Sequence, residues 1–185
     1  TLNFNNTSDN NDNKAIGGRL AFFLLPQLEI GVGLETATVG SNETPYSNVK
    51  ALNNTVDVAF THDVNALKGK VDLRGQYVRL EVDNPDIHPL EFENVSSAVY
   101  AQLAFQPSKV ENSFFKNLEI VGRFDQLDLP AEAPLNVDQD RISVGLNYWF
   151  APSAVFKVAF ESIKSKHEDE EETETKIISQ FSIGF

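Results

Sequence analysis

The last nine residues, Ile177-Ile178-Ser179-Gln180-Phe181-Ser182-Ile183-Gly184-Phe185, decide the expected fold because they alternate with a period of two. In an extended strand, successive side chains point to opposite faces. One face here carries Ile177, Phe181, Ile183 and Phe185, and the other carries Ile178, Gln180, Ser182 and Gly184. Such a strand separates an apolar surrounding from a mostly polar one. We interpret the final Phe as unusual for a water-soluble domain and as typical of a strand that closes a barrel against lipid.

The composition excludes several classes of protein. The 185 residues, a length that suits one domain, include 27 acidic and 15 basic residues, for a formal net charge of -12. A nucleic-acid partner is therefore not expected, because such a binder needs a basic face. The absence of cysteine excludes a disulfide framework, a thiolate metal site and a cysteine nucleophile. Because methionine is absent, even at position 1, we expect the sequence to begin after processing or inside a longer chain.

No apolar run approaches the roughly 18 to 20 residues that a membrane helix needs. The longest run, Leu20 to Leu25, ends at Pro26. The mean hydropathy is -0.26, which is typical of a soluble protein. Neither observation excludes a membrane barrel, because alternation dilutes the apolar residues of its strands.

Segments of about ten residues with alternating apolar and polar residues recur along the chain, and they predict an all-β, antiparallel fold of nine strands. The expected strands are 14–25, 28–37, 50–62, 69–82, 94–106, 118–129, 140–150, 154–164 and 175–185. Helical periodicity is weak, because no long window places apolar residues at positions i, i+3, i+4 and i+7.

The polar sides of these strands carry the charged residues that we expect on a single face. If the apolar face meets lipid, this polar face lines the interior of a transmembrane barrel. The expected lining residues are Arg19, Glu29, Glu35, Asp57, Asp72, Arg74, Glu119, Arg123, Asp125, Arg141, Lys157 and Glu161. Acids slightly outnumber bases in this set, and the two are mixed.

The lengths of the links between strands support the same interpretation. Links 26–27, 63–68 and 151–153 are short, whereas 38–49, 83–93, 130–139 and 165–174 are longer and polar. This alternation is typical of outer-membrane barrels, which have tight periplasmic turns and longer outer loops. The exception is 107–117, which is long where a short link is expected and carries Phe114 and Phe115, so it is expected to pack as a small cap. Residues 1–13 are then an outer loop or the end of a preceding strand, and 14–185 form the barrel strands.

Nine strands is an odd number, whereas bacterial outer-membrane barrels of one chain normally have an even number. We therefore expect the chain to be the C-terminal part of a larger barrel, with Thr1–Phe4 as the end of a truncated strand. A closed barrel formed by these residues alone would contradict this expectation.

Several stretches resemble the phosphate-selective porin O/P-like family of outer-membrane barrels. Residues 118–129, 140–150, 152 and 155–161 are similar to the final strands of that family, and 17–20, 28–31 and 73–77 to earlier ones. The resemblance covers most of the chain as a pattern and not as a catalytic signature. It implies a water-filled pore, a barrel of about 16 to 18 strands, and often a homotrimer. It also implies contact with outer-membrane lipid and lipopolysaccharide. Resemblance to outer-membrane barrels in general implies that the barrel-assembly machinery reads Phe181, Ile183 and Phe185.

The family's anion selectivity is not carried over, because the expected lining residues do not form a clean row of Arg and Lys. These charges would tune ion passage, or they would simply pair across strands, which contributes only about 0.2–1 kcal/mol for each pair. Residues Tyr148, Trp149 and Phe150 precede the turn at Pro152 and are expected to form an aromatic girdle at the periplasmic interface.

No catalytic, metal or cofactor site is expected. The histidines, His62, His88 and His167, are scattered without ligand spacing, and no nucleophile elbow or phosphate loop is present. The acidic run 167–174 lacks the regular ligand positions of a calcium site, so we expect a solvated outer loop.

The expected function is that of a porin for small hydrophilic solutes or ions in the outer membrane, and not that of an enzyme. A plugged barrel that serves as an anchor or partner in a surface complex remains the alternative. A soluble ligand-binding barrel or β-sandwich is a third interpretation, because alternation alone does not identify the solvent.

Overall fold

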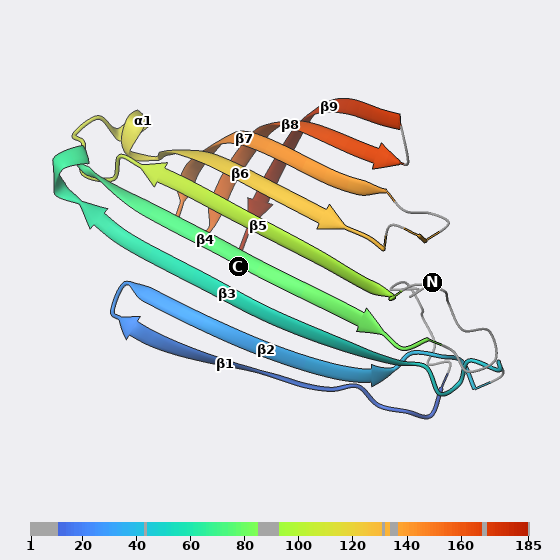
Figure 1. Cartoon of the computed structure of the whole chain (residues 1–185). Coiled ribbons are helices and arrows are strands. Elements are labelled where there is room, and N and C mark those ends of the chain that lie inside the picture. Colours follow the sequence, from blue (N-terminus) through green and yellow to red (C-terminus); the bar gives the residue numbers. More distant parts are fainter. Residues whose placement is uncertain are drawn as a thin grey trace.

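A computed structural model describes residues 11–42, 44–84, 93–130, 132–133, 137–167 and 170–184. It contains nine strands and two short helices (Figure 1). The strands are β1 Ile16–Leu25, β2 Leu28–Thr38, β3 Lys50–Val64, β4 Gly69–Val82, β5 Val95–Gln106, β6 Leu118–Asp128, β7 Asp138–Ala151, β8 Ala154–His167 and β9 Glu170–Ile183. The prediction of an all-β fold with nine strands is confirmed.

The nine strands form one antiparallel sheet in which every strand pairs with its neighbours in sequence, in the order β1 to β9. The sheet curls strongly, so that β7 to β9 turn back behind the front strands in Figure 1. The connections divide between two ends. We call the end with links 39–49, 83–94 and 129–137 the loop end, and the end with links 26–27, 65–68, 107–117 and 152–153 the turn end.

Within the described residues the sheet is open, because β1 and β9 form its edges and do not pair with each other. With nine antiparallel strands, the two edge strands run in the same direction. Direct closure would therefore require a parallel pair, whereas an odd number of further strands between the edges would keep the sheet antiparallel. A β-sandwich would need a second sheet packed on the first, and the described strands form only one.

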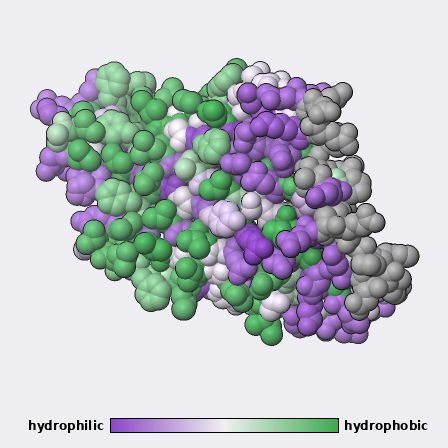
Figure 2. Space-filling view, in the orientation of Figure 1, coloured by the Kyte–Doolittle hydropathy of each residue, from purple (hydrophilic) through white to green (hydrophobic). Residues whose placement is uncertain are grey.

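The described residues have almost no conventional core, since only Ala51, Ala104 and Val155 are buried apolar residues. The apolar residues lie instead on one exposed side of the sheet, which we call the apolar face. Its members include Leu20, Phe22, Val32, Leu34, Val56, Leu73, Leu103, Ile120, Phe124, Ile142, Val144, Leu146, Phe160, Ile177, Phe181 and Ile183, all exposed. Figure 2 shows hydrophobic side chains over much of the turn-end half of one side, and hydrophilic ones toward the loop end.

The connection between β8 and β9 corrects the expected loop over 165–174. Strand β8 continues to His167 and β9 begins at Glu170, so most of the acidic run belongs to a long hairpin. Cross-strand charges stabilise this extension, because Lys164 Nζ lies 3.1 Å from Glu171 Oε1. The prediction of a loop was wrong for Glu170–Glu174, which belong to β9.

The expected cap in link 107–117 is a short helix, α1, Ser113–Lys116. The Asn112 side chain accepts hydrogen bonds from the backbone N–H groups of Phe114 and Phe115, which is the usual N-cap arrangement. The Phe114 ring lies 5.4 Å from that of Tyr148 on β7, so the helix packs against the turn end of the sheet. The other helix is the 3-10 turn η1, Asn65–Leu67, which ends at Lys68 with φ of 49°.

Candidate functional site

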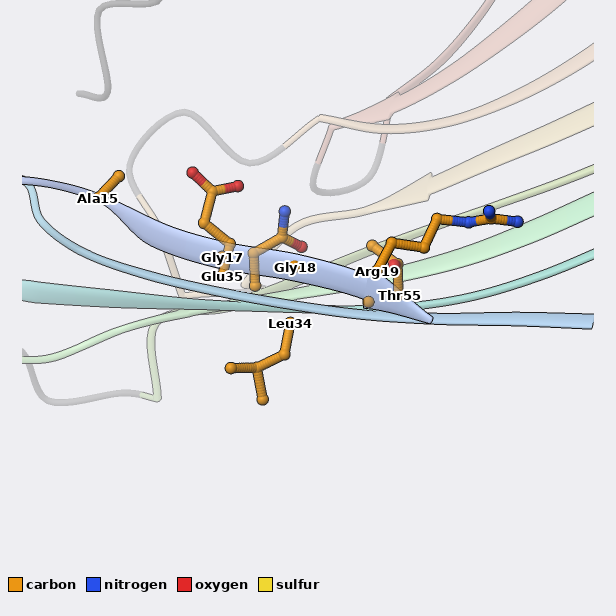
Figure 3. Close-up of a pocket in the computed structure, with 9 residues that line it drawn as sticks. Ala15, Gly17, Gly18, Arg19, Leu34, Glu35 and Thr55 are labelled. Atoms are coloured by element: carbon orange, nitrogen blue, oxygen red, sulfur yellow. The ribbon is translucent and has the colours of Figure 1, made fainter. Parts of the chain in front are cut away.

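Twelve charged residues were expected to share a face, and the register of the strands places all twelve on the same side of the sheet. We call this side the polar face. Directly paired residues share a face and successive residues alternate, so each ladder fixes the side of every residue in its strand. The pairs Asp125 with Arg141 and Asn147 with Lys157 are two examples. Figure 3 shows the alternation at β1 and β2, where Arg19 and Glu35 rise from one side and Leu34 points to the other. Whether this face lines a pore stays a prediction.

A first cluster of charges joins the edge strand to β3. Arg19 Nε donates to Asp57 Oδ2 at 2.9 Å, and Arg19 Nη2 donates to Glu29 Oε1 at 2.7 Å. The Arg19 side chain crosses β2 above Gly31, where an added Cβ would collide with the Asp57 carboxylate and the Arg19 guanidinium. The glycine therefore leaves the room that this three-strand contact needs.

A second cluster lies on β3 and β4. Arg74 Nε donates to Asp72 Oδ1 at 2.8 Å, and Thr61 Oγ1 donates to Asp72 Oδ2 at 2.7 Å. The arginine and aspartate are two residues apart on β4, so their side chains rise next to each other on the same face. The hydroxyl from β3 fixes the second carboxylate oxygen and completes the cluster.

The third cluster spans β5 to β8 and is the largest. Arg123 Nε donates to Asp125 Oδ1 at 2.9 Å, and Arg141 Nε donates to Asp125 Oδ2 at 3.1 Å. The Arg123 guanidinium also lies 4.2 Å from the centre of the Tyr100 ring, which is a cation–π contact. Arg141 Nη1 lies 4.0 Å from Glu161 Oε2 at the far side of the cluster. One carboxylate thus orients two arginines from neighbouring strands.

Some charges of the polar face are not neutralised in this way. Glu119 accepts a hydrogen bond of 2.6 Å from Asn147 Nδ2. Lys157 and Glu35 form no ion pair or hydrogen bond with the described residues. Lys157 lines a hollow of about 310 Å³ at the turn end, shared with Lys70, Asp72, Arg74 and Glu119. The twelve predicted residues therefore divide into paired clusters in the middle and less neutralised charges nearer the ends.

The expected set of lining residues did not include several further residues of this face, namely Lys70, Tyr100 and Trp149. Lys70 and Trp149 have the same parity as the chosen charges of their strands, so the period of two could have found them, whereas Tyr100 lies on β5, which carries none of those charges. The placement of Trp149 in an aromatic girdle was wrong, because Trp149 pairs with Val155 and lines the polar hollow. The pairing of β7 with β8 shifts register after Trp149, where the chain turns from one strand into the next.

The polar face also carries apolar side chains. Phe23 lies on this side of the edge strand, paired with Glu29, and is 72% exposed. Ile163 and Ile178 face the same side on β8 and β9.

The apolar face has its own organisation along the strands. Toward the loop end it changes to polar and charged residues, such as Arg79, Asp128, Asp140 and Lys164. At the turn end it carries an aromatic cluster in which the Phe150 ring lies 5.0 Å from Tyr148 and 6.1 Å from Phe181. The apolar zone is thus bounded on both sides.

Phe181 and Ile183, two of the three residues expected to form the assembly signal, lie exposed on the apolar face. The third, Phe185, lies outside the described residues, as do residues 1–10 and His88. Their role in barrel assembly stays a prediction.

Among the described residues, no group of three or more His, Cys, Asp or Glu side chains is placed to hold a metal ion. Neither helix in this part of the chain has the length and apolar character needed to cross a membrane. No protein-family model, curated protein or solved structure matches the chain.

Proposed function

We propose that the nine-stranded sheet is part of the wall of an outer-membrane β-barrel that passes small hydrophilic solutes or ions. The observation that carries this proposal is the division of the sheet into an exposed apolar face and a face with clustered charges, with almost no core among the described residues. A water-soluble protein rarely exposes a contiguous apolar patch of more than a few hundred Å². Lipid would cover the apolar face, and water would fill the space beside the polar one.

The dimensions of the sheet suit this role. A membrane-spanning strand needs about 9–11 tilted residues, and the strands run from 10 residues in β1 to 15 in β3. Outer-membrane barrels carry an apolar band of about 25 Å with aromatic residues at its borders. The zone between the loop-end charges and the aromatic cluster of Tyr148, Phe150 and Phe181 is the corresponding band. The turn end then faces the periplasm, and the loop end lies outside.

Both edge strands support the assignment to a larger barrel. In lipid, an unpaired backbone N–H or C=O group costs several kcal/mol, so open sheet edges do not occur there. Because β1 and β9 run in the same direction, an odd number of further strands completes an antiparallel sheet. A barrel of about 16 to 18 strands satisfies this condition.

A second candidate function is a non-conducting barrel that acts as an anchor or partner in a surface complex. Phe23 favours it, because an apolar ring 72% exposed on the polar face is better covered by protein than by the water of a pore. The ion pairs around Asp57 and Asp125 would also hold an occluded interior together.

Planar-bilayer recording of the purified protein tests the proposal and separates the two candidates. The porin proposal predicts stepwise conductance increments in salt solution on insertion. Inserted protein without any conductance would overturn the channel role and leave the anchor role. Protein that stays in solution without detergent would overturn both.

A further inference from the structure

The charges of the polar face are distributed unevenly along the strands. In the middle of the sheet the four arginines Arg19, Arg74, Arg123 and Arg141 each contact a carboxylate. Opposite charges in contact largely cancel beyond a Debye length, which is about 8 Å at physiological salt. The middle of the face therefore contributes little net field, and the ends decide the field along the sheet.

Acidic residues predominate at the loop end. Glu35 near the end of β2 and Glu172 near the start of β9 face the polar side, and neither forms an ion pair with the described residues. Glu174 faces the same side and lies 2.9 Å from Lys176. Other acids at this level, such as Asp128 and Asp138, project from the opposite side of the sheet together with Lys50, Lys164 and Lys166, so they do not add to the charge of the polar face.

The turn end has the opposite balance. Lys70 at the start of β4 and Lys157 on β8 line the same hollow on the polar face, and neither forms an ion pair within the described part of the chain. Lys68 and Lys116 lie in the adjacent turns. The acids of the polar face at this end are Glu119, whose hydrogen bond comes from the neutral Asn147, Asp63, which lies 3.1 Å from Lys109, and Asp72, which is paired with Arg74.

We propose that this axial polarity, negative at the loop end and positive at the turn end, makes the pore conduct ions better in one direction than in the other. The inference rests on the proposed function, because it needs an open pore. In the open pore, the negative loop-end mouth accumulates cations and the positive turn-end mouth accumulates anions.

The favoured direction follows from the two mouths. When the loop side is at positive potential, cations enter through the acidic mouth and anions through the basic mouth. Each ion enters where its concentration is raised, so carriers accumulate in the pore and the current is large. With the potential reversed, each ion must enter through the mouth that repels it, and the current is smaller. Fixed charges act over about 10 Å at 0.1 M salt but only about 3 Å at 1 M.

The test is the current–voltage curve of single channels of the purified protein in planar bilayers at 0.1 M and 1 M KCl. The chain has no cysteine, so a Ser47→Cys substitution in a loop-end connection and a charged thiol reagent in one chamber identify the loop side. The expected result is a larger current with the loop side positive at 0.1 M, and a nearly symmetric curve at 1 M.

Glu172 and Glu171 provide a matched pair, because they are neighbours on β9 with opposite orientation. Glu172→Gln and Lys157→Gln should each bring the ratio of the two currents closer to unity, whereas Glu171→Gln on the opposite face should leave it unchanged. A symmetric curve at 0.1 M, rectification of the opposite sign, or an equal effect of Glu171→Gln would overturn the inference while leaving the pore intact. Absence of any conductance would overturn the proposed function itself.

Discussion

A lysine placed on the apolar face of β3 should destabilise the protein far more than a lysine placed on the adjacent polar position. Val56 is 51% exposed between Val32 and Tyr77 on the apolar face. Its neighbour Thr55 has almost the same size and faces the polar side, next to Gly33 and two residues from Asp57. The pair therefore differs mainly in the face from which the new charge would project.

The magnitude follows from the surroundings of each site. Lysine at the middle of the lipid-facing band of a barrel costs about 2–4 kcal/mol, which lowers the folding equilibrium constant by a factor of roughly 30 to 1,000. Thr55→Lys places the ammonium among water, Asp57 and Glu35, so we expect a change below about 0.5 kcal/mol. In a protein whose two faces both meet water, the two variants would be nearly equal.

The assay is reversible urea unfolding in lipid vesicles, followed by the fluorescence of Trp149, which is the only tryptophan. The midpoint should fall for Val56→Lys and stay close to that of the unaltered protein for Thr55→Lys. Equal losses, or a larger loss for Thr55→Lys, would refute the assignment of the apolar face to lipid.

Gly31→Ala should lower the midpoint of urea unfolding relative to Gly18→Ala, because the new methyl group meets the ends of the Arg19 and Asp57 side chains and displaces their contact. Gly18→Ala is the matched control for urea unfolding, since a Cβ at Gly18 meets nothing within 4 Å, and equal effects would contradict the steric reason. Tyr100→Leu should cost about 0.5–1 kcal/mol through the lost cation–π contact with Arg123. A double-mutant cycle with Arg123→Gln measures this coupling, and additive effects would show that the contact contributes nothing.

The strands and their faces were predictable because the period of two acts over the whole sheet. A slip of one residue would move every side chain of a strand to the other face, so Val144 and Ser143, for example, fix the orientation of β7 together. The twelve charges share a face for the same reason. The face of each side chain follows from the alternation within its own strand, so an error of a few residues at the strand ends does not change it.

The contacts between charges were not predictable, because they depend on the relative register of several strands. Arg19 reaches Asp57, 38 residues away, only because two ladders align them and Gly31 leaves the space between. The extension of the β8–β9 hairpin beyond Lys164 and before Thr175 was missed because an acidic run has low strand propensity. Its signal was the charge complementarity of Lys164 and Lys166 with the glutamates that follow.

Trp149 was misplaced because three consecutive aromatic residues were assigned to one girdle. The period of two holds here, since Tyr148 and Phe150 lie on the apolar face and Trp149 on the polar face, and the register shift comes only after Trp149. The open edges of β1 and β9 could not be predicted from the alternation within single strands, because strand pairing depends on the neighbouring strands.

The central claim is that the apolar face contacts lipid while the polar face contacts water. Single spin labels on the cysteine-free chain test it most directly, with Leu103→Cys on the apolar face and Gln102→Cys on the polar face of β5. In lipid vesicles we expect the label at 103 to collide mainly with oxygen, which dissolves in lipid, and the label at 102 mainly with a water-soluble nickel complex. Collision of both labels mainly with the nickel complex would contradict the claim.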